Sequence, residues 1–252
     1  MKDDDKIHKN VFNLLENTPI IKINNLLINN NIDILVKCEN LNPLGTIYSR
    51  INNEIIIDLL NNSGLNFDSI ISNDTKFMEN FNILYNLHMN INKNQLSIAN
   101  KTSIINDKIE KKLNLNYYKN QKKYYINFSN EIYNQCNGNI DIIFISNEPE
   151  GLINGVGHRL KALLPNIQII GVCITENNTD EMDTIPSTFD RGIVDIWAEV
   201  QDSILETFKN EIIKKEGIKC GIKSTSVILS ILKYIDNNDK FKNKKIIGIL
   251  PD

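Results

Sequence analysis

The sequence predicts an α/β fold in which a mainly parallel sheet is flanked by helices, together with a reduced second domain. Three apolar runs carry this prediction, at residues 142–146, 167–172 and 245–250. Short continuous apolar runs are typical of strands that are buried on both faces, as in parallel sheets. These runs alternate with stretches of helical spacing, including an amphipathic stretch at 201–215, and a parallel sheet needs such alternation.

Composition and charge narrow the classes of function. The chain has 252 residues, 41% of them hydrophobic, so it can bury one large core or two modest ones. No apolar run is long enough to indicate a membrane span. The net charge of −3 gives no electrostatic reason to expect nucleic-acid binding.

The cysteines and histidines indicate no metal site. The four cysteines form no CxxC pair and the three histidines are scattered along the chain. We therefore expect four free thiols in a reducing, intracellular compartment, the cytoplasm in preference to an organelle. The acidic, polar start at 1–6 is neither a signal peptide nor a typical transit peptide.

A turn between a strand and a helix is the centre of the predicted site. The strand-like run 32–37 leads into a turn in which Pro43 fixes φ and Gly45 can adopt a conformation that other residues resist. From Ile51 to Leu60, apolar residues recur at helical spacing. The backbone N–H groups at the start of this helix suit an anion.

Residues 39–50 resemble a motif of the cysteine synthase and cystathionine β-synthase family. The family writes this segment as Asn-Pro-Gly-Gly-Ser-x-Lys-Asp-Arg, and its members are fold-type II enzymes that use pyridoxal phosphate. Further matches lie at 17–23, 139–172, 189–197, 216–226 and 244–252, so the resemblance covers most of 17–76 and 139–252. It implies a fold like that of the tryptophan synthase β subunit. The segment 88–140 looks shortened, and its apolar patches at 96–98 and 124–126 are strand candidates.

The resemblance also implies a division of the chain. We expect an N-terminal tail at 1–16 and a larger α/β domain made of 17–50 and 139–252. A smaller, shortened α/β domain takes 51–138. No regulatory domain pair and no haem-binding extension are expected after the strand at 245–250.

The family's cofactor-binding features are altered in this sequence. In the family the motif lysine carries the cofactor as a Schiff base, and that position is Tyr48, whose phenol cannot form an imine. The family's glycine-rich phosphate loop is matched by Glu148, Pro149, Glu150, Gly151 and Leu152. Proline has no N–H to donate. Each glutamate at ~4 Å from a phosphate, with an effective dielectric of ~20, adds repulsion on the order of several kcal/mol. Acidic residues in the first turn of a helix without a ligand are otherwise ordinary.

Two further binding features of the family are also changed. The loop that holds the substrate carboxylate is matched by Ser72, Asn73, Asp74 and Thr75, with two glycines lost and a carboxylate added. The hydroxyl that meets the pyridine nitrogen is matched by Ser224 or Thr225, as a residual ring contact. Serine and threonine at a helix start are more often caps.

These changes predict a catalytically inactive member that holds no cofactor and no metal. Its function would be that of an accessory or interaction subunit, bound to a protein partner or larger assembly, as a homodimer or as a dimer with an active relative. One alternative is an enzyme in the same cleft. It would run pyridoxal-phosphate-dependent β-replacement or an altered chemistry, with Tyr48 as an acid/base group and Asp74 as a second candidate. Another is a small-ligand sensor.

Overall fold

A six-stranded sheet is the centre of the molecule. The computed structural model describes residues 7–26, 32–62, 69–71, 75–91, 112–114, 122–147, 151–175, 190–236, 241 and 243–252. The strand order is β1-β2-β8-β5-β6-β7, and every neighbouring pair is parallel except β1 with β2. The strands are β1 (Ile20–Lys22), β2 (Asp33–Cys38), β5 (Ile142–Ser146), β6 (Gln168–Thr175), β7 (Ile196–Gln201) and β8 (Lys245–Leu250). The predicted α/β fold is confirmed, and the three apolar runs share this sheet.

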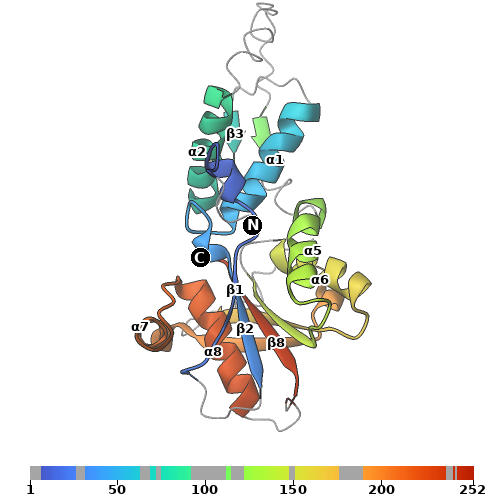
Figure 1. Cartoon of the computed structure of the whole chain (residues 1–252), viewed down its shortest axis with the longest axis vertical. Helices are drawn as coiled ribbons and strands as arrows, with labels where there is room; N and C mark the ends of the chain where they lie inside the picture. The colour runs from blue at the N-terminus through green and yellow to red at the C-terminus, as the bar shows by residue number, and fades with distance from the viewer. Residues whose placement is uncertain are drawn as a thin grey trace, which may run out of the picture.

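Helices cover both faces of the sheet. Figure 1 shows α7 (Leu205–Glu216) and α8 (Ile222–Asp236) on one side, with α5 (Ile126–Gln135) and α6 (Leu152–Leu163) on the other. Side chains of a strand alternate between faces. In β5, Ile143 and Ile145 therefore join the core under α5 and α6, whereas Phe144 joins the core under α8. This double burial explains why the central strands are continuous apolar runs.

A second group of elements lies beyond one end of the sheet. It comprises α1 (Tyr48–Asn62), α2 (Thr75–Ile91) and a small parallel pair, β3 (Ser69–Ile71) with β4 (Lys112–Asn114). In Figure 1 the α1 and α2 helices lie above the six-stranded sheet. Buried residues of α1 and α2 share one apolar cluster with those of α5 and α6. The proposed domain boundaries stay a prediction.

Short 3₁₀ helices link these elements. They are η2 (Val11–Leu14), η3 (Glu39–Leu41), η5 (Lys122–Tyr125), η7 (Arg191–Ile193) and η8 (Asp202–Ile204). The strand candidate at 124–126 is wrong, because these residues end η5 and begin α5. The rings of Tyr124 and Tyr125 are buried against α1 and α6, not in a sheet. This burial explains why aromatic residues stand at these positions. The other candidate, 96–98, lies outside the described residues.

All four cysteines are buried and carry no disulfide. Burial raises the pKa of Cys38 to about 12 and that of Cys220 to about 11, so both thiols resist ionisation. Among the helices that the structure describes, none has the length and apolar character needed to cross a membrane.

Gly155 in α6 is a position where packing allows no side chain. A Cβ atom there would overlap the ring of Tyr125, which is only 1% exposed and belongs to η5. At Gly157, two residues on, a Cβ would lie 2.9 Å from Cγ1 of Ile193 and 3.0 Å from Cδ1 of Ile169, both near the ends of flexible side chains.

We predict that Gly155→Ala lowers the free energy of unfolding by about 1–3 kcal/mol, because the buried ring cannot move away. Gly157→Ala in the same helix is the matched control. Its smaller overlap is offset by the better helix propensity of alanine, about 1 kcal/mol. Urea denaturation of both variants checks this. If both variants lost the same free energy of unfolding, the packing of η5 against α6 would not be the cause of the loss.

Candidate active site

The candidate site lies at the carboxyl edge of the sheet. The chain passes from the end of β2 through η3 and a turn into α1, and α6 begins shortly after the end of β5. The start of α8 reaches the same edge, since the Gly221 amide donates to the backbone oxygen of Asp252 at 2.9 Å, just beyond β8. In open α/β sheets, ligands bind at the carboxyl ends of the strands.

The turn that leads into α1 is fixed by its backbone. Gly45 has φ of +73°, the left-handed conformation that the sequence predicted for it, and its amide donates to the Asn42 carbonyl at 2.7 Å. The Ile47 amide donates to the Pro251 carbonyl at 2.8 Å. The turn is therefore tied directly to the end of β8.

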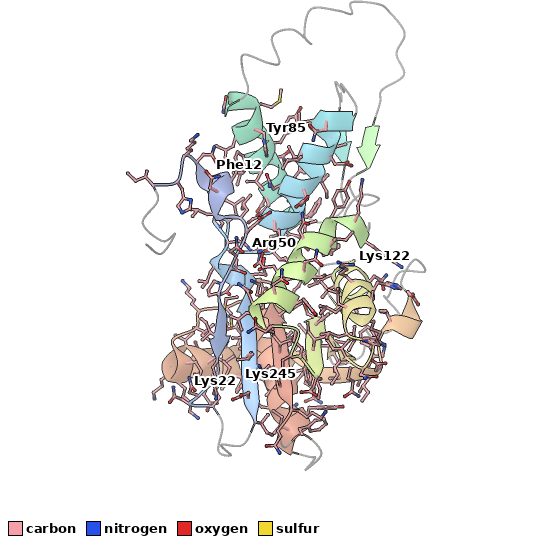
Figure 2. All side chains as sticks on the ribbon, turned by 45° about the vertical axis from the view of Figure 1, so that its right-hand side comes forward. Phe12, Lys22, Arg50, Tyr85, Lys122 and Lys245 are labelled. Atoms are coloured by element: carbon pink, nitrogen blue, oxygen red, sulfur yellow. The ribbon has the colours of Figure 1, made fainter. Side chains whose placement is uncertain are left out.

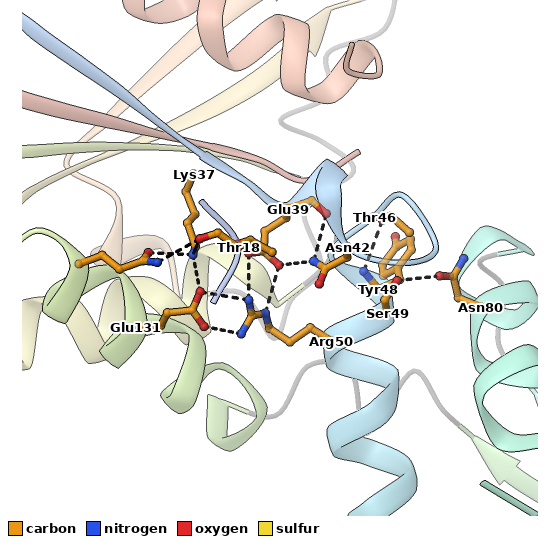
Figure 3. Close-up of polar contacts among 11 residues, drawn as sticks. Thr18, Lys37, Glu39, Asn42, Thr46, Tyr48, Ser49, Arg50, Asn80 and Glu131 are labelled. Carbon is orange, nitrogen blue, oxygen red and sulfur yellow. Dashed lines mark hydrogen bonds and ion pairs between the residues drawn. The ribbon is translucent and has the colours of Figure 1, made fainter. Parts of the chain in front are cut away.

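Four charged side chains, three of them buried and the fourth with its side chain 9% exposed, hold this turn against the sheet. They are Lys37 of β2, Glu39 of η3, Arg50 of α1 and Glu131 of α5 (Figure 3). Arg50 donates to both carboxylates: its Nε lies 3.1 Å from Glu39 Oε2, and one terminal nitrogen lies 2.7 Å from Glu131 Oε2. Lys37 forms an ion pair with Glu131. Two positive and two negative groups make the cluster neutral.

Neutral partners complete the cluster. The backbone oxygen of Thr18 accepts from Lys37 Nζ at 2.5 Å and from Gln135 Nε2 at 3.0 Å, and the Thr18 hydroxyl donates to Glu39. Asn42 Nδ2 donates to Glu39 Oε2 at 2.6 Å. The guanidinium of Arg50 also lies over the ring of Phe128, 5.0 Å from its centroid. Figure 2 shows Arg50 where the upper helices meet the sheet.

Two effects oppose each other in this cluster: burial disfavours the charged form of each side chain, and ion pairing favours it. Burial alone would lower the pKa of Arg50, but the charges of Glu39 and Glu131 raise it above its ordinary value. Burial alone would raise the pKa of Glu131, yet Arg50 and Lys37 hold it below its ordinary value. For Lys37, burial outweighs the pull of Glu131 and lowers the pKa. The ionised state of Glu131 therefore depends on the two cations.

Tyr48 is the first residue of α1, next to this cluster. Its side chain is 5% exposed, and its ring meets that of Phe77 edge to face, with centroids 5.3 Å apart. Its neighbour Ser49 is linked to Asn80 of α2 at 3.4 Å. The residue that the sequence predicts to stand at the family's imine-lysine position is thus packed between the starts of α1 and α2.

Ser224 and Thr225 lie in the first turn of α8, where their hydroxyls bond to the protein. Ser224 Oγ lies 2.8 Å from both the backbone oxygen and Oδ1 of Asp252, and Thr225 Oγ1 donates to the Gly221 carbonyl at 2.8 Å. These contacts agree with the capping role considered for both residues. A residual contact to a cofactor ring is untested.

Only three of the other predicted site residues, Thr75, Gly151 and Leu152, lie at positions that the structure describes. Gly151 caps α6 with φ of +82°, and Leu152 begins that helix fully buried. Thr75 is exposed at the start of α2. Glu148, Pro149, Glu150, Ser72, Asn73 and Asp74 lie outside the described residues. Among the described residues, no group of three or more His, Cys, Asp or Glu side chains could hold a metal ion.

Sequence reasoning missed Lys37, Glu39, Glu131 and Asp252. One signal was present: Lys37 interrupts an otherwise apolar strand, and a lysine inside a buried strand requires an acidic partner. The partner itself is 94 positions away, in a segment that the sequence pattern left largely unread.

We predict that Arg50→Met lowers the free energy of unfolding by about 3–5 kcal/mol, since it leaves two buried carboxylates facing a single cation. The control is Lys22→Met. It breaks an ion pair with Asp33 whose side chains are 53% and 54% exposed, and should cost less than about 1 kcal/mol. Chemical denaturation at neutral pH measures both. If the two variants lost similar amounts of free energy of unfolding, the buried cluster would be no more important to stability than an exposed ion pair.

A pH dependence follows from Glu131. Its pKa in the folded protein is below the ordinary value, so its pairing stabilises the fold above about pH 4.3 and this stabilisation is lost as the pH falls through the folded pKa. Glu131→Gln should therefore be less stable at neutral pH but lose less stability on acidification. Glu211→Gln, at an exposed pair with Lys215 in α7, is the control. If the free energy of unfolding of Glu131→Gln fell with decreasing pH as steeply as that of the wild type, the pH dependence would not come from Glu131.

Comparisons with known proteins give relatives over nearly the whole chain. No family model matches. The chain is 28% identical to cystathionine beta-synthase of Apis mellifera over 98% of its own length, but spans 60% of that relative. It is 24% identical to a cysteine synthase of Buchnera aphidicola, covering 98% of this chain and 95% of the relative. The chain thus spans about three fifths of the length of the first of these relatives.

Solved structures agree on the fold. O-acetyl serine sulfhydrylase isoform 3 from Entamoeba histolytica superposes with a TM-score of 0.76 at 19% identity, covering 100% of this chain and 90% of that one. A hydrogen sulfide-producing enzyme from Fusobacterium nucleatum gives a TM-score of 0.74 at 21% identity, covering 98% of each chain. The fold-type II architecture and the resemblance to the cysteine synthase and cystathionine β-synthase family are confirmed.

The expectation that this chain is not an enzyme is contradicted by these findings. The relatives in sequence are named as cysteine synthase and cystathionine beta-synthase, and the structural neighbours are likewise named as enzymes. That expectation rested on changes at three places together, namely Tyr48, the loop at 148–152 and the loop at 72–75. A change at position 48 excludes an imine there, but it leaves the turn and the charge cluster of the site intact. The expected protein partner or dimer stays a prediction.

Proposed function

From the resemblance in sequence and fold to the cysteine synthase and cystathionine β-synthase family, we propose that this chain is an enzyme that acts on a small amino acid at the carboxyl edge of the sheet. Its chemistry at position 48 is altered. The phenol of Tyr48 takes part as a proton donor or acceptor, in place of the family's imine-forming lysine. Similarity over 98% of the chain supports the enzyme class.

The observation that carries this proposal is the placement of Tyr48. It begins α1 at the carboxyl edge, two residues before Arg50, whose guanidinium is fixed by two buried carboxylates. Glu39, Asn42 and Thr18 fix the turn before it. A group held on such a network has a defined position, and general acid–base catalysis requires that.

A phenol in this position has a limited set of reactions. It cannot form an imine with an aldehyde or a substrate, so no step is assigned to covalent chemistry at position 48. At neutral pH a tyrosine hydroxyl is ordinarily protonated and can donate to a leaving oxygen or sulfur. The names of the relatives and neighbours suggest substrates for testing, namely O-acetylserine with sulfide and the pair that gives cystathionine.

We predict that the purified chain forms cysteine or cystathionine, and that Tyr48→Phe lowers kcat by about 10²–10⁴-fold. This substitution removes only the hydroxyl and keeps the ring that packs on Phe77. Tyr85→Phe in α2 is the matched control and should keep wild-type turnover. Product is measured by mass spectrometry, with and without added pyridoxal phosphate.

Two outcomes would count against the proposal in different ways. If neither product forms with any substrate pair, the enzyme assignment fails. If product forms at the wild-type rate in Tyr48→Phe, the enzyme class holds but the role given to the hydroxyl is wrong.

A further inference from the structure

His158 of α6 lies between two side chains of opposite charge. Its Nε2 atom is 2.7 Å from Nζ of Lys122, the first residue of η5, and 2.8 Å from Oδ2 of Asp190, the residue that precedes η7. Figure 2 shows Lys122 on the outer flank of the molecule. The three residues come from separate parts of the chain and meet at α6, outside the candidate active site.

A single imidazole nitrogen cannot serve both neighbours at once. The ammonium group of Lys122 is only a donor, so a hydrogen bond with it requires a lone pair on Nε2. The ionised carboxylate of Asp190 is only an acceptor, so a hydrogen bond with it requires a proton on Nε2. The two contacts are therefore alternatives, and the position of the proton on the ring selects between them.

The charge of the ring decides which contact forms. A protonated imidazole carries hydrogen on both nitrogens, so it donates to Asp190 and repels Lys122. A neutral ring with its proton on Nδ1 accepts from Lys122 and gives up the hydrogen bond to Asp190. Histidine is the side chain that ordinarily changes charge between pH 5 and 8, so this exchange falls in the physiological range.

Asp190 connects the ring to the backbone of the next element. Its Oδ1 accepts from the Gly192 amide at 3.1 Å and so caps η7, while its Oδ2 faces His158. The Asp190 amide donates to Oδ1 of Asn154, which lies one turn before His158 in α6. A change at His158 therefore alters how the start of η7 is held against the first turns of α6.

The other charged side chains that the structure describes on α6, η5 and α5 are engaged elsewhere. They are Lys123, which pairs with Asp58, Arg159, which donates to Asn130, Lys161, which pairs with Asp195, and Glu131, which pairs with Lys37 and Arg50. Lys122 and Asp190 are thus the described charges that act on the ring directly.

We propose that His158 is a proton-operated switch on α6, which binds Asp190 when the ring is protonated and Lys122 when it is neutral. At acidic pH the ring holds the carboxylate that caps η7. At higher pH it releases that carboxylate and holds the start of η5 instead. The switch does not depend on Tyr48 or on the reaction proposed above.

The test reads the ring of His158 directly in the full chain. Nitrogen-15 NMR of the imidazole nitrogens, recorded from about pH 5 to about pH 8, distinguishes the protonated ring from each neutral tautomer. We expect Nε2 of His158 to lose its proton over this range while Nδ1 keeps its own. The exposed ring of His8 is the control. A His158 ring that does not titrate in this range, or that keeps its proton on Nε2 when neutral, would overturn the proposal.

Two neighbouring lysines of η5 separate the role of Lys122 from a general loss of charge. In Lys122→Met, the neutral ring of His158 should move its proton to Nε2 and keep its hydrogen bond to Asp190. Lys123→Met is the matched control, because Lys123 pairs with Asp58 and not with the ring, and it should behave as the wild type. A neutral ring that still carries its proton on Nδ1 in Lys122→Met would contradict the role given to Lys122.

The cap of η7 gives a second readout. Amide exchange at Gly192, corrected for the intrinsic pH dependence of exchange, should be slower at about pH 5 than at about pH 8. The difference should be up to about fivefold, as expected for a partly exposed ion pair. His158→Gln cannot titrate and should abolish the difference. If the difference persisted in His158→Gln, the ring would not control the cap and the proposal would fail.

Discussion

The buried ion cluster of Lys37, Glu39, Arg50 and Glu131 is the constraint on which the rest of the site depends. Its members come from β2, η3, α1 and α5, so the neutral state exists only when these elements are in one relative arrangement. Taking a charge out of water is costly unless a partner is supplied with good geometry. The cluster therefore ties these four elements to one another.

The same scaffold accommodates different chemistry at position 48. The turn, its left-handed glycine and the arginine two residues on are held by backbone contacts and by the cluster. Tyr48, which the sequence predicts to stand at the family's lysine position, begins α1 as a regular part of that helix. Its ring gains a partner in Phe77, so the substitution is supported by packing.

Local pattern predicted the fold well because the sheet is buried on both faces. The apolar runs that became β5, β6 and β8, the Gly45 turn and the start of α1 all carry their signal within a few residues. The strand predicted at 124–126 was wrong because aromatic residues that pack against helices give the same apolar pattern in sequence as a short strand. Glu131 and Asp252 could not be predicted, since their partners lie 81 and 28 positions away and depend on tertiary contacts.

The strand order has a consequence for how the protein folds. β8 lies between β2 and β5, although every other described strand precedes it in the chain. Before β8 is in place, the β1–β2 pair and the β5–β6–β7 group have no hydrogen bonds to each other. During synthesis, until β8 has formed, β2 and β5 would be edge strands, and exposed edge strands are prone to pairing with other chains. Contacts of such high sequence separation also slow folding, so closure of the sheet by β8 is expected to be a late and slow step.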